Sequence, residues 1–191
     1  MTTNAPEQTT TLDTTLTGEW EIDPTHSRIG FAAKHAMITT VRGQFASYRG
    51  EVHLNEADPA ASRIRLEIDA ASVDTGNTDR DAHLRGEDFF GVDSHPTITF
   101  ASTTVERNDD VYTLIGDLTI NGKTNPVAVE FELVGTSVDP WGKFRAGFEG
   151  RATVNRRDWG LAWNVALDKG GVLVGEKVKL EFDVSAVKKT A

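Results

Sequence analysis

The sequence predicts an all-β protein with about eight antiparallel strands that close into a barrel. Polar and apolar residues alternate with a period of two in segment after segment, for example in "VAVEFEL" (127–133) and "KVKLEFDV" (177–184). Each segment has one apolar and one charged face, which is typical of antiparallel sheets that meet water on one side. Turn signals such as the pair Asn121 and Gly122 separate the segments. Because helical patterns are scarce, the apolar faces must cover one another, and we favour a barrel over a two-sheet sandwich.

The strands are placed by the alternation itself. The expected ranges are 28–35, 43–54, 62–70, 97–105, 111–120, 126–134, 143–154 and 177–185, with 20–22 as an addition to the first. Within the second strand the apolar parity changes after Phe45, which predicts a bulge or bend that re-aims the chain. Prolines, including Pro126, are expected between strands, where a missing N–H is tolerated. An eight-stranded barrel has an interior wide enough for one small ligand.

Two segments, 75–96 and 156–177, lack the alternation. In the first, Thr78 and Asp81 have the spacing of a capping box, which predicts a short helix over about 79–89. The second is long, contains glycines and carries two tryptophans, and long loops in compact domains often form lids or rims. It is equally consistent with a surface connection whose tryptophans fill a gap in the core. We expect both segments to form rims of the barrel interior.

The ends of the chain and its overall charge set further bounds. Eight of the first 17 residues are threonine, which predicts a disordered tail over 1–17 and a barrel over 18–187. No basic start followed by an apolar run marks a secretory signal, so we expect a cytoplasmic protein, and no stretch is apolar enough to span a bilayer. The net charge of −9 disfavours nucleic acid and anionic membrane surfaces. With no cysteine, the chain has no disulfide or thiolate metal site.

The five histidines give no compact metal-ligand signature, so we expect neither a metal nor a cofactor. Ser27 follows His26, but no G-x-S-x-G elbow supports a serine hydrolase. His35 is in phase with Ile29 and Phe31, and we expect it to be a polar group on the inner wall.

A second polar group lies in the expected helix. Arg80, Asp81 and His83 either form a solvated charged face of this helix or make a network that pins it to the barrel mouth.

Six motifs in one order carry a resemblance. They are "W-x-I-D-x-x-H-S-x-I-x-F-x-x-K-H" (20–35), "V-R-G-x-F" (41–45), "R-D-x-H-L-x-x-x-x-F-F" (80–90), "P-x-I-T-F-x-S" (96–102), "G-x-L-T-I-N-G" (116–122) and "N-R-x-D-W-G-L-x-W" (155–163). Over about residues 18–187 the sequence resembles the YceI-like family of bacterial lipid-binding proteins. The resemblance implies an extended eight-stranded antiparallel lipocalin-like barrel with a short helix near one end. It also implies an apolar tunnel that binds a polyisoprenoid, such as an isoprenoid quinone, its precursor or a polyprenyl chain.

The alternation and the resemblance together predict a non-enzymatic carrier of a long isoprenoid lipid. The expected ligand-binding residues are Ile29, Phe31, His35, Phe45, Leu66, Leu84, Phe89, Phe90, Phe100, Leu118, Phe131, Phe148, Trp159, Trp163 and Phe182. Sequestration of other lipophilic or amphiphilic molecules, such as antibiotics, is one alternative. An enzyme acting on an isoprenoid is another, and it would need Asp81, His83 or His35 to converge near a head group.

The pattern leaves two matters open. It does not separate a hollow barrel from a filled one, because both need the same apolar inner face. The expected partner is an isoprenoid lipid or quinone and not nucleic acid, while transient membrane contact and a homodimer stay open.

Overall fold

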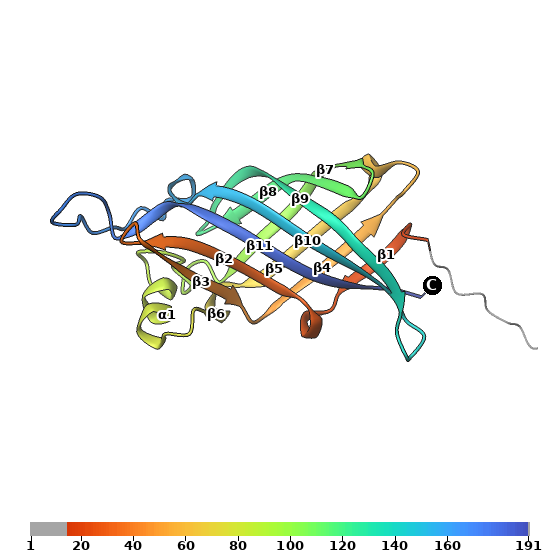
Figure 1. Cartoon of the computed structure of the whole chain (residues 1–191), viewed down its shortest axis with the longest axis horizontal. Helices are drawn as coiled ribbons and strands as arrows, with labels where there is room; N and C mark the ends of the chain where they lie inside the picture. Colours follow the sequence, from red (N-terminus) through yellow and green to blue (C-terminus); the bar gives the residue numbers. More distant parts are fainter. Residues whose placement is uncertain (1–14, 191) are drawn as a thin grey trace, which may run out of the picture.

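The period-two alternation corresponds to eleven β-strands in the computed structural model, which describes residues 15–190 (Figure 1). The strands are β1 (Gly18–Ile22), β2 (Arg28–His35), β3 (Thr39–Phe45), β4 (Tyr48–Leu54), β5 (Arg63–Asp69), β6 (Val73–Asp74), β7 (Thr97–Asn108), β8 (Val111–Ile120), β9 (Lys123–Val138), β10 (Phe144–Asn155) and β11 (Val174–Lys188). The α-helix is α1 (Thr78–Arg85), and short 3-10 helices cover Pro24–His26, Pro59–Ala61, Ala70–Ser72 and Arg156–Trp159.

The strands form a closed antiparallel barrel, as predicted. Their order is β1-β4-β5-β7-β8-β9-β10-β11-β2-β3-β6, and a further pairing of β1 with β11 closes the wall. Some neighbouring strands together make up one position in the barrel wall and count as one strand of the barrel. β1 and β2 form one such strand because both pair with β11. β3 and β4 form a second, because β3 pairs with β2 and β4 pairs with β1. β5 and β6 share a third, since they pair with β4 and β3. These three positions and the strands β7 to β11 make a barrel of eight.

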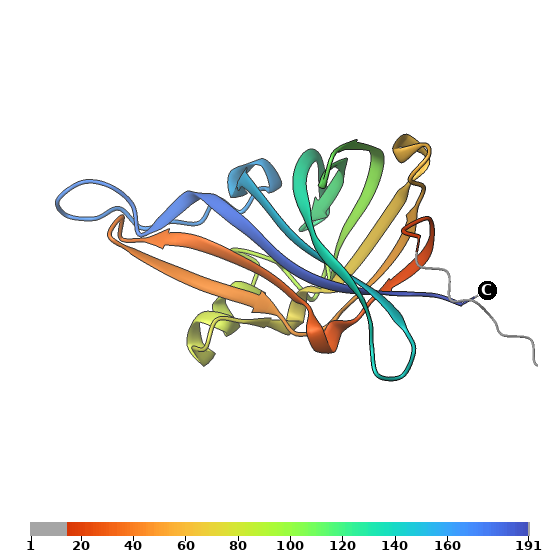
Figure 2. The same ribbon diagram turned by 45° about the vertical axis from the view of Figure 1, so that its right-hand side comes forward.

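The phase change predicted within 43–54 is a break between two strands. β3 ends at Phe45 and β4 begins at Tyr48. The two intervening residues leave the ladder and bond to the segment after β5, with Ala46 N–H donating to Ser72 O at 3.1 Å and Ser47 N–H donating to Ser72 Oγ at 3.0 Å. The break lets the β2–β3 hairpin extend past the body of the barrel (Figure 2).

Strand ends differ from the predicted ranges where hairpins continue. β9 runs over Lys123–Val138 and therefore contains Pro126, which the sequence placed between strands. At Pro126, β9 pairs with Asp117 of β8 on one side, whereas its pairing with β10 begins only at Glu130. A proline is tolerated at this position because one edge of the strand has no ladder hydrogen bonds to lose.

The helix begins one residue before the predicted start and ends earlier. Asn77, not Thr78, is its N-cap, and the Asn77 Oδ1 atom accepts a hydrogen bond from Arg80 N–H at 2.9 Å. The helix ends at Gly86 instead of continuing to Phe89. Glycine favours a helix end because it has low helix propensity.

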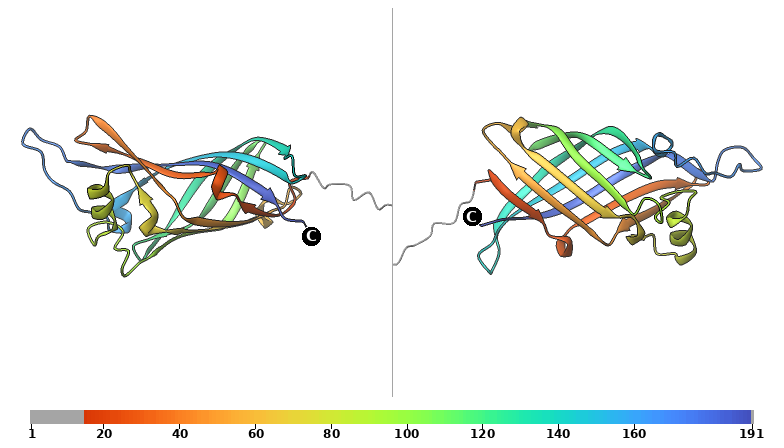
Figure 3. Two further views of the ribbon diagram at one scale, coloured as in Figure 1. Left: turned by 90° about the horizontal axis from the view of Figure 1, so that it is seen from below. Right: turned by 180° about the vertical axis from the view of Figure 1, so that it is seen from behind.

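The barrel has two different ends (Figures 1 and 3). α1, the β2–β3 turn and the loop 160–173 lie at one, which we call the helix end. The start and end of the described chain and the β9–β10 turn lie at the other, which we call the terminal end. Within residues 15–190, no helix is long and apolar enough to cross a membrane.

The predicted tail over 1–17 falls mostly on residues 1–14, which lie outside the described part of the chain. The packed region begins before the predicted boundary at residue 18. Leu16 is buried against Trp20, and Trp20 Nε1–H donates to Leu16 O at 2.9 Å.

Candidate ligand-binding site

The helix end of the barrel encloses an apolar cavity of about 200 Å³. Its wall is built from residues of β1 to β3, β5 and β7 to β11, together with α1 and the segments that follow α1 and β10. A dry apolar cavity of roughly 150 Å³ is already large enough to bind benzene in an engineered protein. The space in this barrel therefore suits a small part of an apolar chain without any rearrangement.

Most of the predicted ligand-binding residues line this cavity. They are Ile29, Phe31, Phe45, Leu66, Leu84, Phe89, Phe90, Phe100, Leu118, Phe131, Trp159 and Phe182. The structure therefore brings together side chains that lie up to 153 positions apart, from Ile29 to Phe182. Their contact with a ligand stays a prediction.

Three predicted residues lie elsewhere. His35 is exposed at the last position of β2, where the hairpin has passed the end of the barrel, so its prediction as a polar group on the inner wall is wrong. Phe148 packs against the buried cluster that contains Tyr112 and does not line the cavity. Its ring is 5.8 Å from the Tyr112 ring. Trp163 does not line the cavity but packs against the core cluster beside it, with its ring 4.5 Å from the His83 ring and 5.7 Å from the Phe89 ring.

The terminal half of the barrel is filled. One buried cluster contains Trp20, Phe144 and Ala146, and the Trp20 and Phe144 rings are 5.6 Å apart. A second contains Val105 and Tyr112. The barrel is therefore hollow at the helix end and packed at the terminal end, which answers the question that the alternation left open.

The segment after α1 covers the mouth of the cavity. Phe89 and Phe90 follow the turn at Gly86, and Phe90 N–H donates to Leu84 O at 3.0 Å. Both phenylalanines are buried, and the Phe90 ring meets the Phe45 ring at 5.7 Å. The prediction that this segment forms a rim agrees with these positions.

Thr75 joins two members of the predicted polar network. The Asp81 carboxylate accepts from Thr75 N–H at 2.9 Å and from Thr75 Oγ1 at 2.6 Å. Arg80 donates through Nε to Thr75 Oγ1 at 2.6 Å and through Nη2 to Thr75 O at 2.8 Å. These bonds tie the first turn of α1 to the chain after β6.

His83 belongs to a different group, since it contacts Asp88 at 2.9 Å and stacks edge-on to Trp163. Neither Asp81, His83 nor His35 lines the cavity, so the structure does not show the convergence that the isoprenoid-enzyme interpretation requires. Among residues 15–190, no three His, Asp or Glu side chains gather as a metal-ligand set.

Arg156 is a cavity residue to which the sequence assigned no role. It lies in the 3-10 helix Arg156–Trp159, directly after β10, and is 6% exposed. Its Nε donates to Gly175 O at 3.0 Å, its Nη2 donates to Val174 O at 3.2 Å, and its Nη1 donates to Leu161 O. The period-two pattern stops at the end of β10, so it could not show that this side chain is buried.

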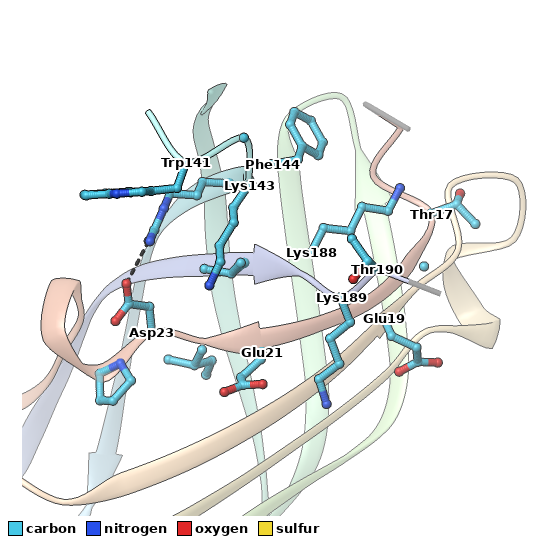
Figure 4. A pocket seen from close by; sticks show the side chains of 16 residues that line it. Thr17, Glu19, Glu21, Asp23, Trp141, Lys143, Phe144, Lys188, Lys189 and Thr190 are labelled. Carbon is cyan, nitrogen blue, oxygen red and sulfur yellow. Dashed lines mark hydrogen bonds and ion pairs between the residues drawn. The ribbon is translucent and has the colours of Figure 1, made fainter. Parts of the chain in front are cut away.

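A second hollow, of about 1320 Å³, lies at the terminal end (Figure 4). Charged side chains line it, including Glu19 and Glu21 from β1 and Lys189 near the end of the chain. Arg145 bridges two carboxylates here, with Nη1 2.7 Å from Asp23 Oδ2 and Nε 2.8 Å from Asp139 Oδ2. Ile22 lines both this polar groove and the apolar cavity. We place the ligand site in the cavity, although the groove is larger, because the wall of the cavity is apolar.

The fold and the cavity define the class of the molecule: an antiparallel β-barrel with a hydrocarbon-lined cavity toward one end. Residues 20–186 match the model of the YceI-like domain, and the chain belongs to the YceI-like family.

Sequence relatives support this membership. A UPF0312 protein of Pseudomonas aeruginosa is 40% identical over 148 residues, which cover 76% of this chain and 78% of the relative. A UPF0312 protein of Yersinia enterocolitica is 36% identical over 180 residues, which cover 93% and 91%.

Solved structures share the fold. The YceI protein of Campylobacter jejuni has a TM-score of 0.70 and 27% identity, covering 82% of this chain and 90% of that one. BcnA of Burkholderia cenocepacia has a TM-score of 0.73 and 23% identity, covering 86% and 98%. A polyisoprenoid-binding domain from Saccharophagus degradans has a TM-score of 0.68 and 15% identity, covering 89% and 98%.

Proposed function

We propose that this protein binds a long isoprenoid lipid, such as an isoprenoid quinone or a polyprenyl chain, in the cavity at the helix end, and does so without catalysing a reaction. The observation that carries the proposal is the nature of the wall. Apart from Arg156 and the indole N–H of Trp159, the lining side chains are hydrocarbon, and Trp159 Nε1–H already donates to Leu118 O at 2.8 Å. Each CH₂ group moved from water into such a wall contributes about 0.8 kcal/mol.

An isoprenoid suits the site better than a compact ligand. Phenylalanines from several strands surround the space, including Phe31, Phe100, Phe131 and Phe182, and they offer a continuous apolar surface for a branched chain. The fold likeness to a polyisoprenoid-binding domain of Saccharophagus degradans supports this choice of ligand class.

A long chain needs more room than about 200 Å³, and the mouth is where the structure can provide it. Leu84, Phe89 and Phe90 lie on the helix and on a loop, not on the hydrogen-bonded barrel wall. We therefore propose that this segment moves aside when a chain enters. The cytoplasmic location expected from the sequence remains part of the proposal.

Native mass spectrometry of freshly purified protein tests the function. We expect a species heavier than the polypeptide by the mass of a lipid, and organic extraction should remove the added mass and yield an isoprenoid. A fatty acid, another lipophile or an antibiotic in the extract would contradict the isoprenoid assignment while keeping the cavity as a lipid site. If the protein carries no ligand and does not take up added geranylgeraniol, a C20 isoprenoid alcohol, the proposal is wrong.

A further inference from the structure

The helix end of the barrel carries exposed apolar side chains beyond the cavity. Met37 and Ile38 lie in the β2–β3 turn and Val165 lies in the loop 160–173; all three are exposed, and Ile38 is 80% exposed. We call residues 34–40 and 164–173 the tip, and its loop reaches farther from the body of the barrel than α1 does (Figures 1 and 3). Apolar side chains that gather on a surface mark a contact with another protein or with a membrane.

Hydrogen bonds hold the two parts of the tip together. Leu173 N–H donates to Val165 O at 2.9 Å, and Ala36 N–H donates to Leu173 O at 2.7 Å. Gly171 lies against Met37, because a Cβ atom at Gly171 would be 3.4 Å from Met37 Cγ. The backbone therefore presents these apolar side chains as one surface.

The backbone of the β2–β3 turn does not favour the residues that it carries. Ala36 and Met37 have φ angles of 48° and 63°, in the left-handed region that glycine, asparagine and aspartate adopt most easily. The other non-glycine residues with positive φ within residues 15–190 are Asp109 and Asn121, which belong to these types. Local conformation therefore does not account for a methionine at position 37, and because its side chain is exposed, core packing does not either.

The tip continues the wall of the cavity. β2 runs from Ala33 into the turn, and the loop leaves the wall at Leu161 and returns to it at Val174. All three of these residues line the cavity. A surface that binds the tip therefore lies next to the mouth of the cavity.

The charge of the tip is opposite in sign to that of the whole chain. The tip contains two exposed lysines, Lys34 and Lys169, and one acid, Asp168, so its formal charge is +1 with His35 neutral, whereas the chain has −9. A lysine beside apolar residues can keep its stem in an apolar layer and place its ammonium group near lipid phosphates. The local charge therefore suits a membrane surface, although the net charge of the chain does not.

A bilayer fits the shape of the tip better than a protein partner does. A specific protein interface buries about 800 Å² on each partner, which needs a broad surface. The tip is a narrow projection from the barrel (Figure 2). A bilayer needs no complementary surface, because apolar side chains enter the boundary between the headgroups and the acyl chains.

We propose that the tip inserts into the surface of a lipid bilayer, with Met37, Ile38 and Val165 among the upper acyl chains and Lys34 and Lys169 at the lipid phosphates. The contact turns the helix end of the barrel, and with it the mouth of the cavity, toward the membrane. This inference goes beyond the proposed function and does not require it, because the tip binds a bilayer whether or not the cavity holds an isoprenoid.

Flotation of the full chain with vesicles tests the contact. The vesicles consist of phosphatidylcholine with a minority of phosphatidylglycerol and contain no isoprenoid. We expect the wild-type protein to float with them, and Ile38→Ser should lower its partition coefficient at least about tenfold, because one large apolar side chain no longer leaves water.

Met37→Asn separates membrane binding from stability. It should lower the partition coefficient too, while its Tm stays the same or rises, because asparagine tolerates the positive φ at this position. Trp141→Ser is the matched control, since Trp141 is 81% exposed but lies in the β9–β10 turn at the terminal end. This variant should float as the wild-type protein does.

A fluorescent label locates the contact. The chain has no cysteine, so Thr40→Cys in the tip and Ser137→Cys near the terminal end each accept a single environment-sensitive dye, and both positions are exposed. Adding vesicles should shift the emission of the dye at position 40 to the blue and leave the dye at position 137 unchanged.

The inference is wrong if the wild-type protein does not float, or if a folded variant that combines Ile38→Ser with Met37→Asn floats equally well. A loss of flotation confined to Trp141→Ser would assign the membrane contact to the terminal end. A wild-type dimer that becomes a monomer in Ile38→Ser would assign the tip to a second copy of the chain. Because the vesicles lack isoprenoid, none of these results depends on the proposed function.

Discussion

Tyr112 shows at the scale of single residues how the filled half of the barrel is built. It is 5% exposed, and its hydroxyl has no hydrogen-bond partner within residues 15–190. Burial raises the pKa of Tyr112 above its ordinary value, so the phenol stays neutral at physiological pH. A buried hydroxyl without a partner costs about 1–3 kcal/mol relative to one in water.

Replacing Tyr112 with phenylalanine should therefore raise the stability, by about 1 kcal/mol in a urea titration, because the ring packing remains and the unpaired hydroxyl is removed. Tyr48 provides the matched control, since its hydroxyl donates to Ser27 O at 2.8 Å. Tyr48→Phe should lower the stability by a similar amount. Equal destabilisation by both substitutions would show that the Tyr112 hydroxyl has a partner after all.

Single residues also show what the sequence could not specify. Alternation identified the inward side of Phe31 and Phe131 correctly. Parity predicts which face of a strand a side chain lies on, but it does not predict where along the barrel axis the side chain lies. Phe148 has the right parity and lies in the filled half, and His35 has the right parity on a part of β2 that no core covers. Arg156 follows the last residue of β10, where no periodic signal exists.

At the scale of elements, one ion-pair network holds the terminal end together. Arg145 of β10 links Asp23, the N-cap of the 3-10 helix Pro24–His26, to Asp139 at the base of the β9–β10 turn. A hydrogen bond from Thr25, with further bonds from Arg145 and His26, holds the pKa of Asp23 well below its usual range. The network therefore joins β1, β10 and the β9–β10 turn across 122 positions in sequence between Asp23 and Arg145.

The sign of the resulting pH dependence follows from the lowered pKa. A carboxyl with a depressed folded-state pKa stabilises the fold above its unfolded pKa, about 3.9, and this stability is lost as the pH falls through the lower folded-state value. Asp23→Asn should lower the Tm by a few degrees at pH 7, and its difference from the wild-type protein should shrink as the pH falls below about 4. Thermal melts from pH 7 to pH 2 measure this. A Tm difference that stays constant over that range would mean that the Asp23 charge contributes no stability.

Elements with strong periodicity were predicted well, and those governed by local caps were not. β2 and β8 have the predicted bounds, because turns at both ends stop the alternation. The start of α1 was misplaced because Thr78 and Asp81 imitate a capping box, whereas Asp81 bonds to Thr75 and Asn77 supplies the cap. Only the folded chain brings Thr75 within reach of both Arg80 and Asp81.

At the scale of the whole molecule, the barrel is divided into a hollow and a filled half. Large side chains such as Trp20 and Phe144 fill the terminal half, whereas at the helix end phenylalanine side chains line the cavity. The sequence predicted a closed barrel from its apolar faces, but the total of apolar residues does not determine where a void remains. Under the proposed function, the helix end would hold the ligand and the packed terminal half would support it.

The most direct test of this account is a binding titration with two matched variants of β9. Val129 is 4% exposed and lines the cavity, whereas Val134, farther along the same strand, is 64% exposed. Val129→Phe places extra carbon atoms in the void and should weaken geranylgeraniol binding at least about tenfold with little loss of stability, because the space is empty. Val134→Phe should bind as the wild-type protein does. If Val129→Phe is folded and binds geranylgeraniol as tightly as the wild-type protein, the ligand does not occupy the cavity and the central claim is wrong.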